Sequence, residues 1–331
     1  MVYDAFLLLS FGGPEGQDDV LPFLENVTRG RGIPRERLEA VAGHYRHFGG
    51  VSPINAQCRE LIEALRPGFE LPIYWGNRNW HPMLADTVRQ MRDDGVQRAI
   101  AFVTSPFGSY SSCRQYRDDI DRARAEVPGA PVIDKIRHYH DHPGYIAPHA
   151  DAVRAAVAGR TSPRLVFTAH SIPTSMNAAS GPGGVGRYQA QLLETARLVA
   201  AQAAPELSWD LVWQSRSGPP QVPWLEPDIN DHLEQLAKDG VTEVVVSPIG
   251  FISDHLEVLW DLDEEAKATA DRLGLDYVRA ATPGADPRFV DLIRELVAER
   301  VLAHGNVRHA LGTIPTWDFC PADCCVSPKR P

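Results

Sequence analysis

Short apolar runs alternate along the chain with longer segments in which apolar residues recur at helical spacing. This alternation is typical of βαβ units, in which helices cover both faces of a parallel sheet. Eight runs have the length of strands, four on each side of residue 160: 5–10, 71–75, 98–104, 131–134, 164–170, 209–214, 243–247 and 276–280. Helical patterns occupy residues 17–27, 34–46, 55–66, 83–94, 114–126, 144–158, 187–203, 229–238, 255–272 and 287–303.

The equal number of strands on the two sides predicts an α/β protein with two similar, doubly wound lobes. We expect an N-terminal lobe over residues 1–159 and a C-terminal lobe over 160–285, followed by a final helix at 286–304 that packs back on the first lobe. Residues 305–331 lack apolar periodicity and contain four prolines, so they are predicted to form a tail rather than a third domain.

The composition narrows the class of protein. Hydrophobic residues make up 44% and charged residues 23% of the 331 positions, which is typical of globular chains and argues against a disordered or collagen-like one. The 43 acidic residues outnumber the 33 basic ones, which argues against nucleic acid or an anionic membrane as a partner. The first residues lack the basic start of a signal peptide, and no apolar run reaches the roughly 18 residues of a membrane span, so we expect a cytoplasmic protein with no integral membrane segment.

An acidic helical segment follows the seventh predicted strand, and ligands of open parallel sheets bind beyond the carboxyl ends of strands. Glu257, Asp261 and Glu265 recur every four residues, so an α-helix capped by Ser253 would carry their carboxylates on one face. Like charges at this spacing oppose helix formation by about 0.2–0.5 kcal/mol per pair. A solvated acidic face has the same pattern, but the position at a strand end favours a divalent-cation site or a proton path.

His170 ends the fifth predicted strand. A single histidine at a strand end is often structural. The acidic segment follows a neighbouring strand of the same lobe, however, and an imidazole beside a carboxylate can accept protons or bind a transition metal. We therefore interpret His170 as a functional residue.

Three of the five cysteines, Cys320, Cys324 and Cys325, fall within six residues of the predicted tail. A segment without a core of its own gains order most easily by binding a metal. Cys113 or Cys58 could supply a fourth thiolate, and four thiolates suit either zinc or a [2Fe–2S] cluster. Exposed cytosolic thiols are the alternative interpretation.

Residues 181–186 match the dinucleotide-binding pattern G-x-G-x-x-G. No predicted strand directly precedes them and Pro182 occupies the first variable position, so we interpret them as a loop before the helix at 187–203. The sequence also contains no phosphate loop of the G-x-x-x-x-G-K-[ST] type and no G-x-S-x-G elbow.

Six segments, taken together and in order, closely resemble the ferrochelatase family over about residues 3–303: 8–14 (LLSFGGP), 49–54 (GGVSPI), 168–173 (TAHSIP), 213–215 (WQS), 222–227 (VPWLEP) and 250–258 (GFISDHLEV). The resemblance implies two Rossmann-like lobes with a porphyrin cleft between them. It also implies an enzyme, a metal chelatase of the lyase class, which inserts Fe²⁺ into the macrocycle and releases two pyrrole protons.

The resemblance also implies residue roles. His170 matches the family's active-site histidine and Glu257 its partner acid, and these two would meet the substrate Fe²⁺. Asp261 and Glu265 match an acidic ladder that serves as a proton relay or a metal path. The chemistry requires both functions, because a porphyrin nitrogen must lose its proton before it coordinates a metal.

Relatives of the Gram-positive, coproporphyrin-using branch bind the propionates of the porphyrin with residues that align with Arg29, Tyr45, Ser52 and Tyr116. An arginine and three hydroxyls suit carboxylate recognition. Two positions depart from those relatives. Phe11 replaces a tyrosine that can contact the metal, and His44 stands where another propionate-binding arginine is expected.

Part of the family carries a [2Fe–2S] cluster on three C-terminal cysteines and one internal cysteine. The resemblance assigns these positions to Cys320, Cys324, Cys325 and Cys113, although the adjacent pair departs from the wider spacing in animal relatives. Cys58 is then a core or surface thiol.

These observations together predict a monomeric coproporphyrin III ferrochelatase of haem synthesis, with coproporphyrin III and Fe²⁺ as substrates and a downstream haem-synthesis enzyme receiving the iron coproporphyrin. Protoporphyrin IX is the alternative substrate. A porphyrin carrier or iron sensor without turnover is the alternative of a different class, which the retained His170 and acidic ladder disfavour.

Overall fold

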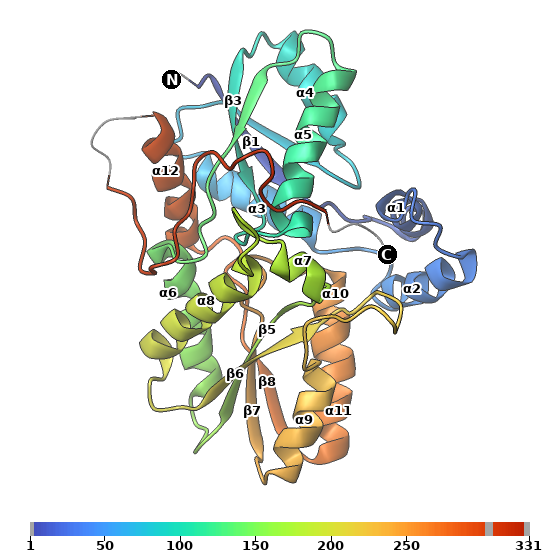
Figure 1. Ribbon diagram of the computed structural model, residues 1–331, viewed down its shortest axis with the longest axis vertical. Helices are drawn as coiled ribbons and strands as arrows, with labels where there is room; N and C mark the ends of the chain where they lie inside the picture. The colour runs from blue at the N-terminus through green and yellow to red at the C-terminus, as the bar shows by residue number, and fades with distance from the viewer. Residues whose placement is uncertain (1–2, 302–306, 328–331) are drawn as a thin grey trace.

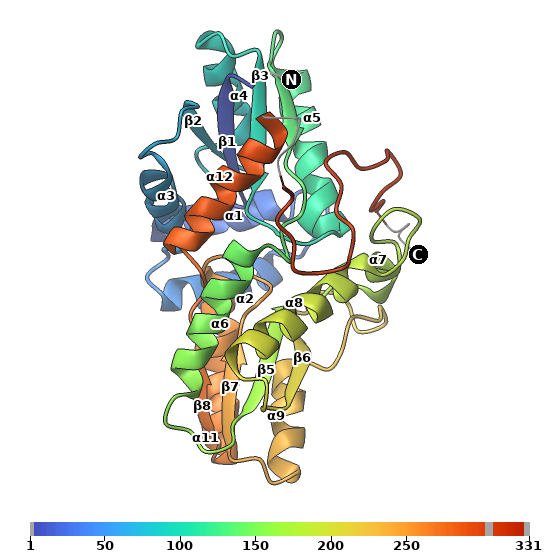
Figure 2. The same cartoon turned by 90° about the vertical axis from the view of Figure 1, so that its left-hand side faces the viewer.

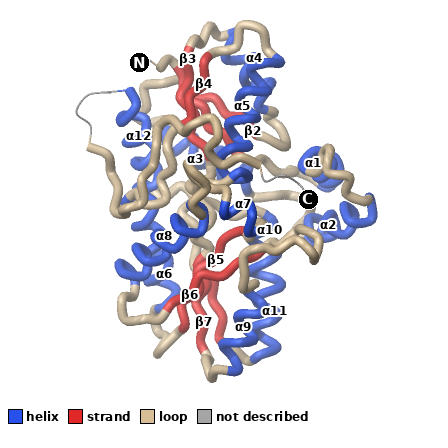
Figure 3. Tube along the Cα trace, viewed as in Figure 1, coloured by secondary structure: helices blue, strands red, loops and turns tan. Residues whose placement is uncertain are grey.

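The computed structural model describes residues 3–301 and 307–327. It contains two four-stranded parallel sheets with strand orders β2-β1-β3-β4 and β6-β5-β7-β8 (Figures 1 and 3). The strands are β1 (Ala5–Ser10), β2 (Ile73–Asn77), β3 (Arg98–Val103), β4 (Val132–Lys135), β5 (Arg164–His170), β6 (Trp209–Gln214), β7 (Glu243–Ser247) and β8 (Asp276–Arg279). The predicted α/β class with two doubly wound lobes is confirmed, and each strand boundary lies within two residues of its predicted position.

Helices surround both sheets. They are η1 (Gln17–Asp19), α1 (Val20–Val27), α2 (Arg35–His47), α3 (Ile54–Leu65), α4 (Leu84–Asp93), η2 (Tyr110–Arg114), α5 (Gln115–Glu126), α6 (Pro143–Val157), α7 (Thr174–Ala178), α8 (Arg187–Ala203), α9 (Ile229–Lys238), α10 (Leu256–Val258), η3 (Leu259–Ala266), α11 (Lys267–Leu273) and α12 (Pro287–Val301). Of these, η2 and η3 are π-helical. Within the described residues, no helix is both long enough and apolar enough to cross a membrane.

Strand β1 shows why apolar runs become central strands in this fold. All six of its residues are buried. Phe6 and Leu8 pack on one side with α3 and α12, while Leu7 and Leu9 pack on the other with α4 and α5. Because successive side chains of a strand point to opposite faces, a strand covered by helices on both faces must be apolar throughout.

The second lobe repeats this arrangement and shares a core with the first. Phe167 of β5 belongs to the same cluster of buried side chains as Phe6 of β1, and α6, α8 and α12 contribute to that cluster. Val166 faces the opposite side, where it packs with α9 and α11. The boundary predicted at residues 159 and 160 falls in the turn between α6 and β5 and stays a prediction.

Helix α12 packs against α3 and α6, two helices that both precede residue 160 in the sequence (Figure 2). The described tail residues 307–327 follow it and form no helix or strand. In both ribbon views they run along the outside of the molecule, from α12 past α8 toward α5 (Figures 1 and 2). Residues 302–306 and 328–331, which complete the predicted final helix and tail, lie outside the described residues.

The helix predicted at 255–272 differs from the expectation in two ways. It begins at Leu256 with His255 as the residue before its first turn, so the prediction of Ser253 as its cap is wrong. Its middle, residues 259–266, is π-helical rather than α-helical.

Candidate functional site

His170 and Glu257 face each other across the carboxyl ends of β5 and β7. The Nε2 atom of His170 lies 3.7 Å from Glu257 Oε2, and both side chains are accessible to solvent, with 34% and 48% of their surfaces exposed. His170 Nδ1 lies 2.5 Å from the backbone oxygen of Ser171. A carbonyl oxygen only accepts hydrogen bonds, so Nδ1 carries a proton, and in the neutral tautomer of this ring the lone pair lies on Nε2. This nitrogen can therefore accept a proton or bind a metal ion on the side of Glu257.

Buried groups hold the backbone around His170. The hydroxyl of Tyr188 donates to the His170 carbonyl oxygen at 2.8 Å, and the backbone N–H of Ser171 donates to Gln214 O at 2.8 Å. Tyr188 and Gln214 are almost completely buried. The imidazole thus extends from a backbone whose position is fixed by the core.

The acidic ladder of Glu257, Asp261 and Glu265 runs along α10 and the π-helical segment η3. Four residues of an α-helix turn through about 400°, so a four-residue repeat drifts by about 40° per step. The i→i+5 bonding of a π-helix places more residues in each turn, so a four-residue step in η3 turns through less than about 400° and counteracts the drift of the α-helical step.

Asp261 is the member of the ladder that its surroundings perturb most. Burial raises the pKa of its carboxyl to about 7, and the charges of Glu257 and Glu265 add to this effect. Hydrogen bonds from the Ser215 hydroxyl and from Gln214 Nε2, the latter at 3.3 Å, act in the opposite direction. Ser215 adopts a left-handed backbone conformation, with φ of 61°, which is uncommon for a residue other than glycine and occurs mostly where the surroundings impose it.

Other acidic residues near the ladder have separate partners. Arg279 of β8 binds Asp254 at 3.0 Å and Asp263 at 2.6 Å. Glu264 lies 3.3 Å from His47 Nε2. The pairing of Asp254 and Asp263 with Arg279 gives these two carboxylates a structural role, separate from the ladder.

The first lobe contacts the ladder through α2. Tyr45 is buried with Leu256 in one apolar cluster, and burial, followed by the charges of Glu257 and Asp261, raises the pKa of its hydroxyl. His44 stacks on Trp260 with ring centroids 3.9 Å apart, and Trp260 Nε1 donates to Glu265 at 2.9 Å. Sequence reasoning missed Trp260, although an indole among acidic residues was a visible signal.

The predicted propionate residues differ in accessibility. Arg29 follows α1 and is exposed, whereas Tyr45, Ser52 and Tyr116 are buried. Tyr116 lies under the guanidinium of Arg78, whose carbon is 4.4 Å from the ring centroid. Of these four residues, Tyr45 lies near the acidic ladder, where the charges of Glu257 and Asp261 act on its hydroxyl.

Sequence reasoning also missed Arg78. It is nearly buried, pairs with Asp119, and lies 5.8 Å from the ring of Phe11. Its position directly after β2, at the carboxyl end of the sheet, could have identified it.

Four cysteines from distant parts of the sequence gather where the tail meets η2. The sulfur atoms of Cys324 and Cys325 lie 3.6 Å apart. A hydrogen bond from Cys324 lowers the pKa of Cys320. Burial raises the pKa of Cys113, and the nearby thiols of Cys320 and Cys325 raise it further. The grouping is loose, because the described residues place no three cysteine sulfurs within 4.8 Å of one another. Cys58 lies elsewhere, in α3 beside a small cavity of about 10 Å³.

The surroundings of these thiols are suited to anionic sulfur. The N–H of Gly181 donates to Cys325 Sγ at 3.2 Å. Hydrogen bonds from Cys324 lower the pKa of Cys320 and Cys325, and the charge of Lys135 acts in the same direction. Arg114 Nη1 donates to the backbone oxygens of Ala322 and Cys324. Four thiols and a backbone N–H donor fit a [2Fe–2S] cluster, in which four thiolates share two irons and hydrogen bonds to sulfur tune the centre.

Comparison with known proteins agrees with this geometry. The family model "Ferrochelatase" matches residues 3–301. The chain belongs to the ferrochelatase family. It is 55% identical to "Coproporphyrin III ferrochelatase" of Nocardia farcinica, over 100% of this chain and 99% of that relative. It is also 53% identical to the protein of the same name from Streptomyces griseus (98% and 93% of the two chains) and to "Ferrochelatase" of Rhodopirellula baltica (99% and 95%).

Solved structures show the same fold at low sequence identity. SirB from Bacillus subtilis with Fe³⁺ superposes with a TM-score of 0.55 at 13% identity, covering 90% of this ferrochelatase-family chain and 97% of SirB. A sirohydrochlorin chelatase SirB in complex with cobalt gives a TM-score of 0.51 at 12% identity, with 92% and 97% covered. The two-lobed architecture is therefore shared with other chelatases.

Proposed function

We propose that this protein inserts Fe²⁺ into coproporphyrin III and releases two protons, forming iron coproporphyrin in haem biosynthesis. The observation that carries the proposal is the accessible pair of His170 and Glu257, 3.7 Å apart, which continues into an acidic ladder. Family membership and the names of relatives 53–55% identical over nearly the whole chain support the reaction and the substrate.

In this proposal His170 and Glu257 act at the porphyrin nitrogens and at the incoming Fe²⁺. The lone pair on His170 Nε2 takes a proton from the macrocycle, and the neighbouring carboxylate of Glu257 stabilises the imidazolium that forms. Asp261 then accepts the proton, since a carboxyl whose pKa is about 7 is partly ionised at neutral pH. Glu265, which is exposed, completes the relay or supplies oxygen ligands to the arriving metal ion.

Arg29, Tyr45, Ser52 and Tyr116 are the proposed propionate-binding residues. The exposed cation of Arg29 can form charge-assisted hydrogen bonds with a carboxylate. The proximity of Tyr45 to Glu257 supports a porphyrin position against α2. Tyr45, Ser52 and Tyr116 are buried, so their hydroxyls must become accessible when the porphyrin binds.

We further propose that Cys113, Cys320, Cys324 and Cys325 bind a [2Fe–2S] cluster. The N–H of Gly181 and the nearby positive charges support thiolate ligands there. Such a cluster would supply one-electron redox chemistry and would cross-link the tail to η2. We also propose that the protein acts as a cytoplasmic monomer that passes its product to a downstream enzyme.

The deciding experiment is anaerobic Fe²⁺ insertion by the purified protein, followed by absorbance, with coproporphyrin III and protoporphyrin IX offered separately at equal concentration. Faster turnover of coproporphyrin III is expected. Preference for protoporphyrin IX would keep the enzyme and overturn the substrate and the propionate set. Tight porphyrin binding without turnover of either would favour a carrier.

A further inference from the structure

A buried carboxylate on α8 holds the tail. Glu194, with 7% of its surface exposed, accepts a hydrogen bond from the backbone N–H of Thr313 at 2.7 Å and another from the Thr313 hydroxyl at 3.1 Å. Its second oxygen accepts from the N–H of Ile314 at 3.3 Å and lies 3.1 Å from His140 Nε2. Although burial raises it, these hydrogen bonds lower the pKa of Glu194 to about 2.

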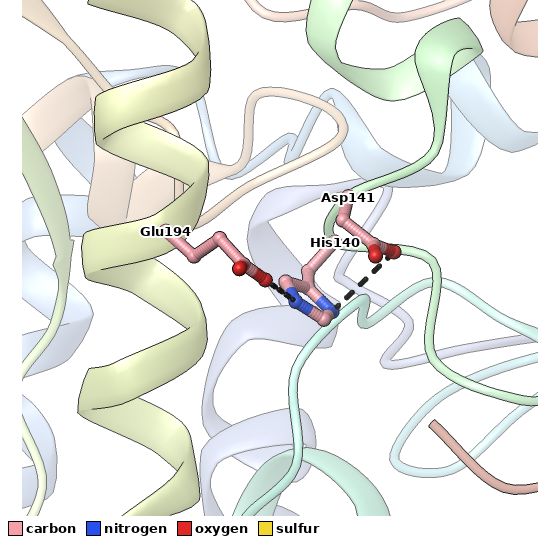
Figure 4. A group of neighbouring side chains, drawn as sticks. All are labelled: His140, Asp141 and Glu194. Atoms are coloured by element: carbon pink, nitrogen blue, oxygen red, sulfur yellow. Dashed lines mark hydrogen bonds and ion pairs between the residues drawn. The ribbon is translucent and has the colours of Figure 1, made fainter. Parts of the chain in front are cut away.

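The segment between β4 and α6 completes the binding site for the tail. Figure 4 shows the ring of His140 between the carboxyl groups of Glu194 and Asp141, and all three side chains are buried. The backbone oxygen of Asp141 accepts from the N–H of Leu311 at 2.9 Å. Gly312 fits closely here, because a Cβ at this position would overlap Glu194 Oε2 and lie 3.0 Å from Asp141 Cβ. We call Glu194, His140 and Asp141 the tail socket.

The tail socket contains residue types that bind metals, and one ligand atom of each lies within 4.8 Å of the others. Both oxygens of Glu194 already accept hydrogen bonds from Thr313 and Ile314, however. The tail itself is therefore the ligand that this site fits.

Further contacts lie between the tail socket and the cysteines. Trp317 lies 5.4 Å from the guanidinium carbon of Arg187, and Phe319 lies 4.5 Å from that of Arg300. Arg137 and Glu299 form hydrogen bonds with the backbone of His309, which lies 11 positions before Cys320, whereas Ile314 lies six positions before it. Docking of the tail in the socket thus shortens the chain between the last anchor and Cys320 about twofold, which raises the effective concentration of the three tail thiols at Cys113.

We propose that the tail socket is an intramolecular docking site for residues 311–314 and that it positions Cys320, Cys324 and Cys325 for cluster assembly. The assembly part of this proposal rests on the [2Fe–2S] assignment above, whereas the docking part does not. Glu194 acts here as a positioning residue, since it lies in α8 and acts on the cysteines through the tail.

Two substitutions test the docking from its two sides. Glu194→Gln removes the charge from α8, and Gly312→Ala adds the overlapping Cβ in the tail, where it leaves both sheets untouched. In a Cys320→Ser background, which removes a proposed cluster ligand, we expect chymotrypsin to cleave after Trp317 and Phe319 about tenfold faster in each variant. Glu206→Gln, an exposed carboxylate exchanged in the same way, is the matched control and should leave cleavage unchanged.

The same two substitutions in the otherwise native chain test assembly. Iron and acid-labile sulfide per chain should fall in both, and the double variant should be no worse than the more severe single one, because both remove one contact. Unchanged cleavage in both variants would overturn the docking. Faster cleavage with full cluster content would overturn the assembly role, and a native chain without iron and sulfide would overturn the cluster assignment and with it the assembly role. A metal retained in the Cys320→Ser protein but lost with Glu194→Gln would make the tail socket an ion site instead.

Discussion

At the scale of single residues, Asp261 combines a half-buried carboxyl with an accessible neighbour, Glu257. Burial raises its pKa to about 7, while the Ser215 hydroxyl favours the ionised form. A carboxyl with this pKa can take up and release a proton at neutral pH, as a relay requires. Ser215 donates its hydrogen bond to Asp261 from a left-handed backbone conformation.

Replacement of Ser215 should therefore change the pH dependence of iron insertion. Ser215→Ala and Ser215→Gly both remove a hydrogen bond that lowers the pKa of Asp261, so this pKa should rise above 7. Asp261 must be ionised to accept a proton, so activity at pH 7 should fall and recover at higher pH. The measurement is kcat/KM for coproporphyrin III between about pH 5.5 and 9. Ser217→Ala is the control, because Ser217 lies two residues further along the chain and is exposed, and it should leave the pH profile unchanged. An acid limb of the profile that does not shift in either Ser215 variant would contradict the relay.

Replacement of His170 should separate chemistry from binding. His170→Ala removes the base at the end of β5, and kcat should fall by about 10²–10⁴-fold, the usual contribution of general acid–base catalysis. Coproporphyrin affinity, measured by fluorescence quenching, should stay within a few-fold, because other residues are proposed to hold the propionates. Full turnover at saturating porphyrin would exclude His170 from the chemistry.

At the scale of elements, whether a helix or strand could be predicted depended on the pattern that it leaves in the sequence. Strands β1 and β5 were predictable because burial on both faces demands an unbroken apolar run. The π-helix at 259–266 was not, since its four-residue acidic repeat also fits an α-helix. The proximity of His170 and Glu257 was predictable, because the two residues follow neighbouring strands of one sheet. The tail socket was not predictable, because the tail docks largely through backbone N–H groups, which every residue type except proline carries.

Arg279 fixes the start of the acidic ladder, and its loss should destabilise that element. It joins β8 to Asp254 and Asp263, and Arg279→Ala would leave two partly buried carboxylates unpaired. We expect a loss of about 2 kcal/mol in the free energy of unfolding, somewhat below the range for fully buried pairs. Arg272→Ala in α11 breaks an exposed pair with Glu234 of α9 and should cost less than about 1 kcal/mol. Equal losses in chemical denaturation would contradict a special role for Arg279.

At the scale of the whole molecule, the two lobes are joined in two ways. One is the apolar core shared by β1, β5 and α12, which links the sheets through buried side chains. The other is the tail, which bonds to α8 through Glu194 and reaches α5 through the hydrogen bond from Arg117 to the Pro321 oxygen. A metal centre between Cys113 and the tail would make this second connection much stronger, because coordination energy then adds to the folding energy of the segment.

The cluster assignment makes a prediction for the whole protein. Purified under anaerobic conditions, the native chain should be reddish-brown. It should contain about two iron atoms and about two acid-labile sulfides per chain, as a [2Fe–2S] centre requires. Cys320→Ser should lose both, together with the visible absorption, because three thiolates hold the centre poorly. Cys58→Ser is the matched control, since Cys58 is buried in α3 beside its own small cavity, and it should keep the full cluster. Zinc in place of iron and sulfide would keep the four-cysteine site and change the metal, whereas equal iron and sulfide in both variants would exclude Cys320 as a ligand.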